Sequence, residues 1–154
     1  RGYSMAERLA LDTSVIIEYI VLRSTYRPIV VKLFNLASTG KVELYTSPIT
    51  LSEVLYVVSK IYQVARVHNP NSEALDFVEW VKRRTKVVEV NEDIMFRAGE
   101  LKKQLRIVLP DCYVIATAEA VKATPVFKAV EKEMEPVLAK LRKLGVKFLE
   151  EMEI

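Results

Sequence analysis

Cysteine, histidine and glycine are scarce in this chain, and each scarcity excludes a class of protein or site. The single cysteine, Cys112, rules out an intramolecular disulfide framework and gives no sign of secretion, so we expect a small core residue. The single histidine, His68, has no second histidine with which to share a metal, and we expect it at the surface. Four glycines, six prolines and a hydrophobic fraction of 51% indicate a compact chain rather than a disordered one.

Long apolar runs are also missing, since no stretch approaches the roughly 18–20 residues that a bilayer-spanning helix needs. We therefore expect a cytoplasmic protein with no membrane segment. The length fits a single domain, residues 5–154, whose core is large enough to fold without disulfides or a structural metal. We expect residues 1–4, which precede Met5, to be a remnant of expression.

Charge of either sign is nearly balanced, because 23 Lys and Arg face 20 Asp and Glu. Three of those acids are Glu150, Glu151 and Glu153, so 23 basic residues face 17 acidic ones in the rest of the chain. A basic body attracts phosphates through its summed field. Abundant Lys and Glu equally suit a heat-adapted surface, and composition does not separate the two interpretations.

What the sequence does contain is an alternation of short apolar runs with segments of helical periodicity, which is typical of βαβ units. Leu9–Leu11 has the continuous apolar character of a strand buried on both faces. Further strands are expected over 42–46, 86–90, 123–127 and 146–149. Helices are expected from Thr13 or Ser14 to Leu22 and over 29–37, 50–62, 72–84, 92–105, 112–121 and 131–144. The pattern predicts an α/β fold, a three-layer α/β/α sandwich around a parallel sheet.

Three carboxylates stand in apolar surroundings, unlike most acids in the chain. Asp12 ends the first strand, and ligands of open α/β sheets gather outside the carboxyl ends of the strands. Asp111 has apolar residues on both sides, and Glu53 has apolar residues one helical turn away. Ionised carboxylates in such places are costly unless they are paired or bind a metal, and carboxylates that gather raise one another's pKa. A divalent cation such as Mg²⁺, which needs few protein ligands, removes both conflicts.

Each carboxylate also has an ordinary structural interpretation. Asp12 and Asp111 can each cap the helix that follows them. Thr50-x-x-Glu53 matches a capping box, in which Glu53 bonds the backbone amide of Thr50. Spacing alone leaves these interpretations and the metal site open.

Three segments, in this order and approximate spacing, resemble the PIN-domain nucleases. They are Leu-Asp-Thr-Ser-Val-Ile at 11–16, Thr-x-x-Glu at 50–53 and Leu-Pro-Asp-Cys-Tyr-Val-Ile-Ala-Thr-Ala at 109–118. The resemblance covers nearly all of residues 7–149, and the apolar helix after Asp111 is its most specific part. It looks most like the VapC toxins of prokaryotic toxin–antitoxin pairs, particularly the archaeal type.

The resemblance implies a ribonuclease that depends on Mg²⁺ or Mn²⁺ and hydrolyses RNA phosphodiester bonds with water as the nucleophile. Asp12 and Asp111 would bind the metal most directly, while Glu53 would complete the metal site or act as the base. Three hydroxyl side chains would support the site by holding a water or a phosphate oxygen: Thr13, Ser14 and Thr50.

The usual fourth acid of PIN domains, just after the strand that follows the apolar helix, is missing from its place. The chain has Phe-Lys-Ala-Val at 127–130, and its nearest acids are Glu131 and Glu133. Glu131 either reaches the site as a fourth catalytic acid or is an exposed charge stabilised by the helix dipole. Without a fourth acid, a second metal is not expected, and a catalytically silent PIN domain that binds RNA or protein becomes an alternative.

For a VapC toxin, the resemblance also implies a homodimer and a small VapB-like antitoxin that blocks the acidic cleft. The apolar faces of residues 15–22 and 54–62 are candidate interfaces or equally parts of the core. Basic side chains suited to the RNA backbone, or simply to a solvated surface, are Lys82, Arg83, Arg84, Lys102, Lys103, Arg106 and Lys128. A PIN nuclease of RNA processing or decay is the second alternative. A receiver-type phosphoacceptor domain is rejected because Asp12 has no acidic partner beside it.

Overall fold

Five strands within residues 6–153 form one parallel sheet in the order β3-β2-β1-β4-β5. The strands are β1 (Glu7–Leu11), β2 (Val42–Thr46), β3 (Lys86–Val87), β4 (Thr124–Phe127) and β5 (Lys147–Phe148). The structure, a computed structural model, describes residues 6–153. The expected expression remnant at residues 1–4 lies outside the described residues.

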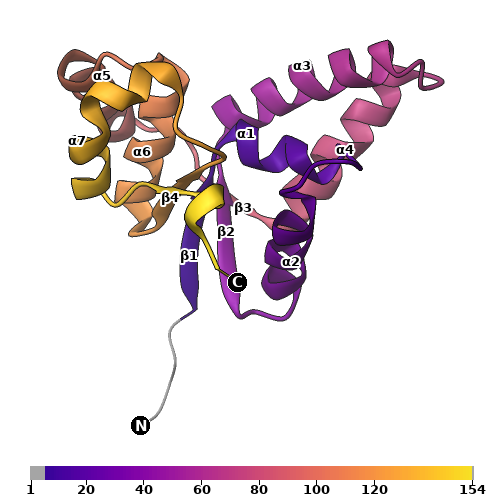
Figure 1. Cartoon of the computed structure of the whole chain (residues 1–154), viewed down its shortest axis with the longest axis horizontal. Helices are drawn as coiled ribbons and strands as arrows, with labels where there is room; N and C mark the ends of the chain where they lie inside the picture. Colours follow the sequence, from indigo (N-terminus) through magenta and orange to yellow (C-terminus); the bar gives the residue numbers. More distant parts are fainter. Residues whose placement is uncertain (1–5, 154) are drawn as a thin grey trace, which may run out of the picture.

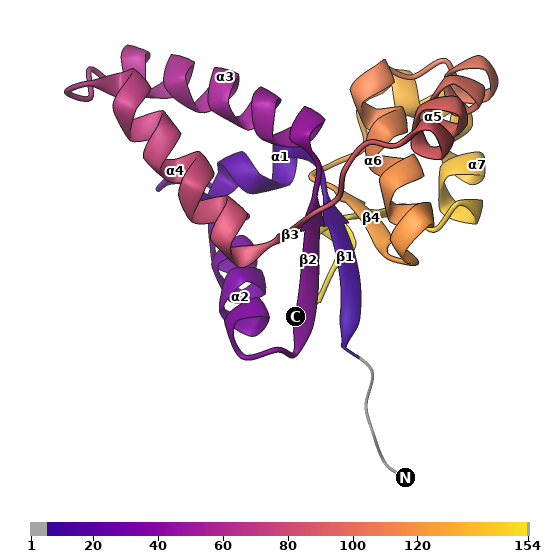
Figure 2. The same cartoon turned by 180° about the vertical axis from the view of Figure 1, so that it is seen from behind.

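Helices cover both faces of the sheet, so the molecule has three layers (Figures 1 and 2). One face carries α1 (Thr13–Ile16), α2 (Arg27–Ser38), α3 (Pro48–Val64) and α4 (Pro70–Arg84), and the other carries α5 (Glu92–Leu105), α6 (Leu109–Val121) and α7 (Leu138–Lys143). The expected α/β/α sandwich around a parallel sheet is therefore confirmed. Across the described part of the chain, no helix combines the length and the apolarity that crossing a bilayer requires.

Alternation along the strands divides the buried side chains between two cores. Leu9 and Leu11 pack with helices α1 to α4, whereas Ala10 between them packs with Ala118 of α6. Successive side chains of a strand point to opposite faces, so a strand covered on both sides is apolar throughout. Cys112 is buried in a separate cluster that α5, α6 and α7 form with β4 and β5, as the sequence predicts.

The candidate interface faces are parts of the core in this chain. Val15, Val54 and Val58 are fully buried in the cluster that joins α1 to α4 and the sheet. Leu22 and Tyr56 are the exposed large apolar residues within these two ranges. The sequence did not distinguish a core face from an interface face in these two helices, because both have the same periodicity of apolar residues.

The helix expected from Thr13 or Ser14 to Leu22 is wrong in length and in its cap. α1 ends at Ile16 and continues as a short 3₁₀ turn, Ile17–Tyr19. Asp12 is the N-cap, and its Oδ2 accepts a hydrogen bond from the Ser14 N–H at 3.0 Å. Three consecutive β-branched residues, Val15 to Ile17, lose side-chain freedom in a helix and weaken its continuation.

The later elements are shorter than expected. The helix expected over 131–144 is a 3₁₀ segment, Lys132–Val137, followed by α7, because Pro136 has no N–H with which to continue a regular helix. The strands expected over 86–90 and 146–149 form only two-residue strands, β3 and β5. Both lie at the outer edges of the sheet, where they have one neighbour each.

The strand order places a ligand site at the end of β1. The chain runs outward from β1 through β2 to β3 and then returns to the other side of β1 as β4. Such a topological switch point leaves a crevice outside the carboxyl ends of the two central strands. Asp12 lies there, and its backbone N–H donates to the Val126 carbonyl of β4 at 3.0 Å.

Candidate active site

Three oxygens of one acidic group define the centre of the candidate site. One carboxylate oxygen from each of Asp111, Glu131 and Glu133 lies within 4.8 Å of the other two. Asp111 is in the first turn of α6, and the two glutamates belong to the segment that follows β4. Glu131 is exposed, as the second sequence interpretation has it, and its carboxylate also lies near that of buried Asp111, so both interpretations remain open.

Asp111 is the most constrained member of this triplet. It is 5% exposed, and its Oδ2 is one of only two buried side-chain polar atoms in residues 6–153 with no hydrogen-bond partner. Burial, followed by the charges of neighbouring carboxylates, raises the pKa of Asp111 to about 8. The cap interpretation of Asp111 is wrong, because Val108 is the N-cap of α6 and no side chain caps that helix.

Asp12 and Glu53 lie outside the triplet but are electrostatically coupled to it. The charge of Asp12 raises the pKa of Asp111, Glu53 and Glu131. The pKa of Asp12 itself is raised by burial, although the hydrogen bonds from Ser14 and Thr13 lower it. The interpretation of Asp12 as a helix cap is confirmed. The capping hydrogen bond is accepted by Oδ2, and Asp12 still contributes its charge to the acidic cluster.

Glu53 is held by a residue from another element. The Thr13 hydroxyl donates to Glu53 Oε1 at 2.9 Å. The capping-box interpretation is wrong, since Ser47 is the N-cap of α3 and accepts a hydrogen bond from the Thr50 N–H at 3.2 Å. Burial raises the pKa of Glu53, the Thr13 hydrogen bond lowers it, and the charge of Asp12 raises it.

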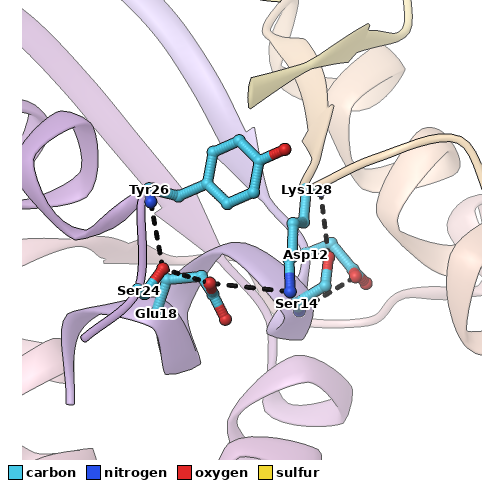
Figure 3. A network of polar contacts seen from close by, with 6 residues as sticks. All are labelled: Asp12, Ser14, Glu18, Ser24, Tyr26 and Lys128. Atoms are coloured by element: carbon cyan, nitrogen blue, oxygen red, sulfur yellow. Dashed lines mark hydrogen bonds and ion pairs between the residues drawn. The ribbon is translucent and has the colours of Figure 1, made fainter. Parts of the chain in front are cut away.

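Ser14 links the acidic cluster to a second polar network (Figure 3). Its Oγ accepts a hydrogen bond from the Lys128 N–H at 3.1 Å. The ammonium of Lys128 lies 3.6 Å from Glu18 Oε1, and the Ser24 hydroxyl donates to that same oxygen at 2.5 Å. Sequence reasoning missed Glu18, although it stands between Ile17 and Tyr19 as a carboxylate in apolar surroundings.

Glu133 was named from the sequence as a nearby acid but was assigned no role in the site. Its signal was its position two residues after Glu131, in the segment directly after β4. Glu131 is the extended N-cap residue of the 3₁₀ segment, and Glu133 lies in its first turn. Both place a carboxylate oxygen near Asp111, while Met134 beside them is buried in the core.

The donor set of this site fits a divalent cation. All five acids offer carboxylate oxygens, which are the ligands that Mg²⁺ and Mn²⁺ prefer. Within residues 6–153, no Lys or Arg forms an ion pair with Asp12, Glu53 or Asp111. Asp111 Oδ2 therefore has a free lone pair in a negative environment, and a cation satisfies both the oxygen and the charge.

The protein is therefore an α/β domain with a cluster of carboxylates at the topological switch point of its parallel sheet. Within that class, the chain belongs to the PIN domain family, whose profile matches residues 9–140. No curated protein sequence matches the chain.

Solved structures with the same fold include several VapBC toxin–antitoxin proteins. One is VapBC from Salmonella typhimurium bound to DNA, with a TM-score of 0.67, 18% identity and coverage of 93% of this chain and 98% of that one. Another is VapBC2 from Rickettsia felis bound to a DNA fragment of its promoter, with a TM-score of 0.65, 19% identity and coverage of 92% of this chain and 98% of that one. A third is VapC20 of Mycobacterium tuberculosis, a sarcin–ricin loop cleaving toxin, with a TM-score of 0.60, 12% identity and coverage of 84% of this chain and 94% of that one. These likenesses show the fold.

Proposed function

We propose that this protein is a ribonuclease dependent on Mg²⁺ or Mn²⁺, and that it is the VapC-like toxin of a VapBC-type pair. The observation that carries the proposal is Asp111, a buried carboxyl group with an unpartnered oxygen and four further acids raising its pKa. Family membership supports nuclease activity, and the VapBC neighbours support a toxin with an antitoxin. The sarcin–ricin loop cleaving neighbour supports RNA as the substrate class.

The acids divide into ligands and a base in this proposal. Asp12 and Asp111 hold the cation together with Glu131 and Glu133, whose oxygens approach Asp111. When bound, the cation acts as a Lewis acid that activates water and offsets negative charge on the phosphate. Glu53 accepts the proton of the attacking water, because its hydrogen bond from Thr13 orients it and favours its ionised form.

The hydroxyl residues support this arrangement. Ser14 fixes Asp12 through its backbone N–H and fixes the start of the β4–β5 connection through its hydroxyl. The Thr50 carbonyl lies 3.4 Å from Thr13 Oγ1, so Thr50 helps to place the hydroxyl that bonds Glu53. The proposal includes a cytoplasmic location, where RNA is found, a VapB-like antitoxin over the acidic cluster, and a homodimer.

Cleavage of RNA by the purified full chain tests the proposal. Labelled RNAs of varied sequence are incubated with Mg²⁺ or Mn²⁺, with EDTA as one control. Asp12→Asn and Asp111→Asn should each lower the rate more than about 100-fold, because even groups that only orient metal ligands are worth 10–100-fold. Glu135→Gln is the matched control, because Glu135 is exposed on the same 3₁₀ segment as Glu133 but outside the triplet.

Two results would overturn the proposal. Equal cleavage by wild type, Asp12→Asn and Asp111→Asn would assign the activity to another site or to a contaminating nuclease. Inactivity of the wild type on every RNA, with metal binding demonstrated by calorimetry, would favour a silent PIN domain.

A further inference from the structure

A lysine stands at the carboxyl end of β4, beside the acidic cluster. Lys128 directly follows Phe127, the last residue of β4. Its backbone N–H donates to Ser14 Oγ, and the Ser14 N–H donates to Asp12 Oδ2, so two hydrogen bonds tie its position to the cluster (Figure 3). The backbone of Lys128 is therefore fixed at the topological switch point of the sheet, and its side chain extends from there.

The ammonium of Lys128 is held near Glu18 but keeps N–H donors that can bind another anion. It lies 3.6 Å from Glu18 Oε1, which is an ion-pair distance but longer than a hydrogen bond. The Lys128 side chain is 40% exposed, whereas that of Glu18 is 7% exposed. The centroid of the Tyr26 ring lies 5.8 Å from Nζ. The N–H donors of Lys128 consequently remain available to an anion that arrives from solvent.

Glu18 is itself fixed by Ser24, which lies in the loop between the 3₁₀ turn Ile17–Tyr19 and α2. The Ser24 hydroxyl donates to Glu18 Oε1, and Ser24 Oγ accepts a hydrogen bond from the Tyr26 N–H. A buried carboxylate with this support is a rigid anchor for a flexible lysine. Anchoring lowers the entropy that a long side chain loses when it binds a ligand.

We infer that Lys128 binds a backbone phosphate of the RNA next to the scissile bond, and that Glu18 is a positioning residue that holds Lys128 there. The inference rests on the proposed function. A phosphate that approaches five carboxylates meets repulsion, and a fixed cation at the edge of the cluster offsets it. Lysine binds phosphate as a point charge, which a single exposed ammonium satisfies.

The competing interpretation is that Lys128 only neutralises the buried Glu18. A double variant separates the two, because Glu18→Gln removes the charge that needs neutralising. If neutralisation is the whole role, Glu18→Gln with Lys128→Met restores both stability and RNA binding. If Lys128 binds phosphate, the double variant restores the thermal midpoint but not the RNA affinity.

The experiment measures RNA binding in an Asp12→Asn background, so that the RNA is not cleaved. Fluorescence anisotropy of a short labelled single-stranded RNA is recorded over a series of salt concentrations. Lys128→Met should weaken binding about tenfold and reduce the slope of log affinity against log salt by about 0.7, which is the contribution of one phosphate contact on a single strand. Lys128→Arg should keep the slope, and Glu18→Gln should weaken binding by a smaller factor with the slope unchanged.

Lys41→Met is the matched control, because Lys41 is exposed and directly precedes β2, at the amino ends of the strands, whereas Lys128 follows the carboxyl end of β4. It should leave the slope unchanged. The inference is wrong if Lys128→Met binds with the wild-type slope, or if the double variant regains wild-type affinity. If the chain with Lys128 intact binds RNA at no salt concentration, the proposed function itself fails, and the two failures are thereby distinguished.

Discussion

The Thr13 hydroxyl donates a hydrogen bond to Glu53 Oε1 at 2.9 Å, and this bond joins two elements that are 40 residues apart. Thr13 begins α1 after β1, and Glu53 lies in α3 after β2. β1 and β2 are parallel neighbours, so their carboxyl ends bring the two side chains to one edge of the sheet. The bond stabilises the ionised form of Glu53 in a place where burial disfavours it.

Thr13→Val should therefore raise the pKa of Glu53 and destabilise the fold modestly. We expect the acidic limb of the pH–rate profile for RNA cleavage to move to higher pH, because Glu53 must lose its proton to act as a base. The loss of one hydrogen bond should lower the free energy of unfolding by about 1 kcal/mol. Thr39→Val, at an exposed threonine after α2, is the control and should not move the acidic limb. An unshifted profile in Thr13→Val would exclude Glu53 as the base.

The stability of the metal-free protein should fall as pH rises. Asp111 has an ordinary pKa of 3.8 and a folded-state pKa of about 8, so between these values the folded state binds a proton that the unfolded state lacks. The stabilisation is thus complete below about pH 4 and is lost through about pH 8. Chemical denaturation in EDTA across this range measures it.

Asp111→Asn should flatten that dependence, since the amide cannot lose a proton. Asp76→Asn, at an exposed residue of α4, should leave the slope as it is in the wild type. A metal-free wild type whose stability is constant or increases from pH 5 to pH 8 would contradict the burial and crowding of Asp111.

Mg²⁺ or Mn²⁺ should raise the thermal midpoint, because a ligand that binds only the folded state stabilises it by mass action. Glu133→Gln should weaken this effect by removing one carboxylate of the triplet, while Glu135→Gln should not. Differential scanning fluorimetry with a titration of each ion compares the three proteins. Equal shifts in all three would remove Glu133 from the metal site.

The sequence predicted those features that depend on local pattern. The buried strand Leu9–Leu11 followed from its continuous apolar character. The helix expected over 92–105 is α5, whose N-cap Asn91 accepts a hydrogen bond from the Ile94 N–H through Oδ1. The placement of Asp12 at the end of β1 followed from the same strand. Such features need only residues that are neighbours along the chain.

The missed features depend on contacts between distant elements. Lys128 and Glu18 lie 110 residues apart in the chain, and only the β1–β4 pairing makes them neighbours. The capping box failed because Ser47 capped α3 three residues earlier and left Glu53 free to bond Thr13. Glu133 was given no role because its approach to Asp111 brings together two segments that lie 22 residues apart in the chain.

The location of a bound Mn²⁺ ion tests the central claim most directly, namely that distant acidic side chains form one cation site. A crystal of the protein soaked in Mn²⁺ and measured for anomalous scattering reports the position of the ion. We predict a peak in contact with a carboxylate oxygen of Asp111 and of at least one of Asp12, Glu131 and Glu133. An ordered active-site region with no anomalous peak at Asp111, or a peak at an unrelated surface, would contradict this account.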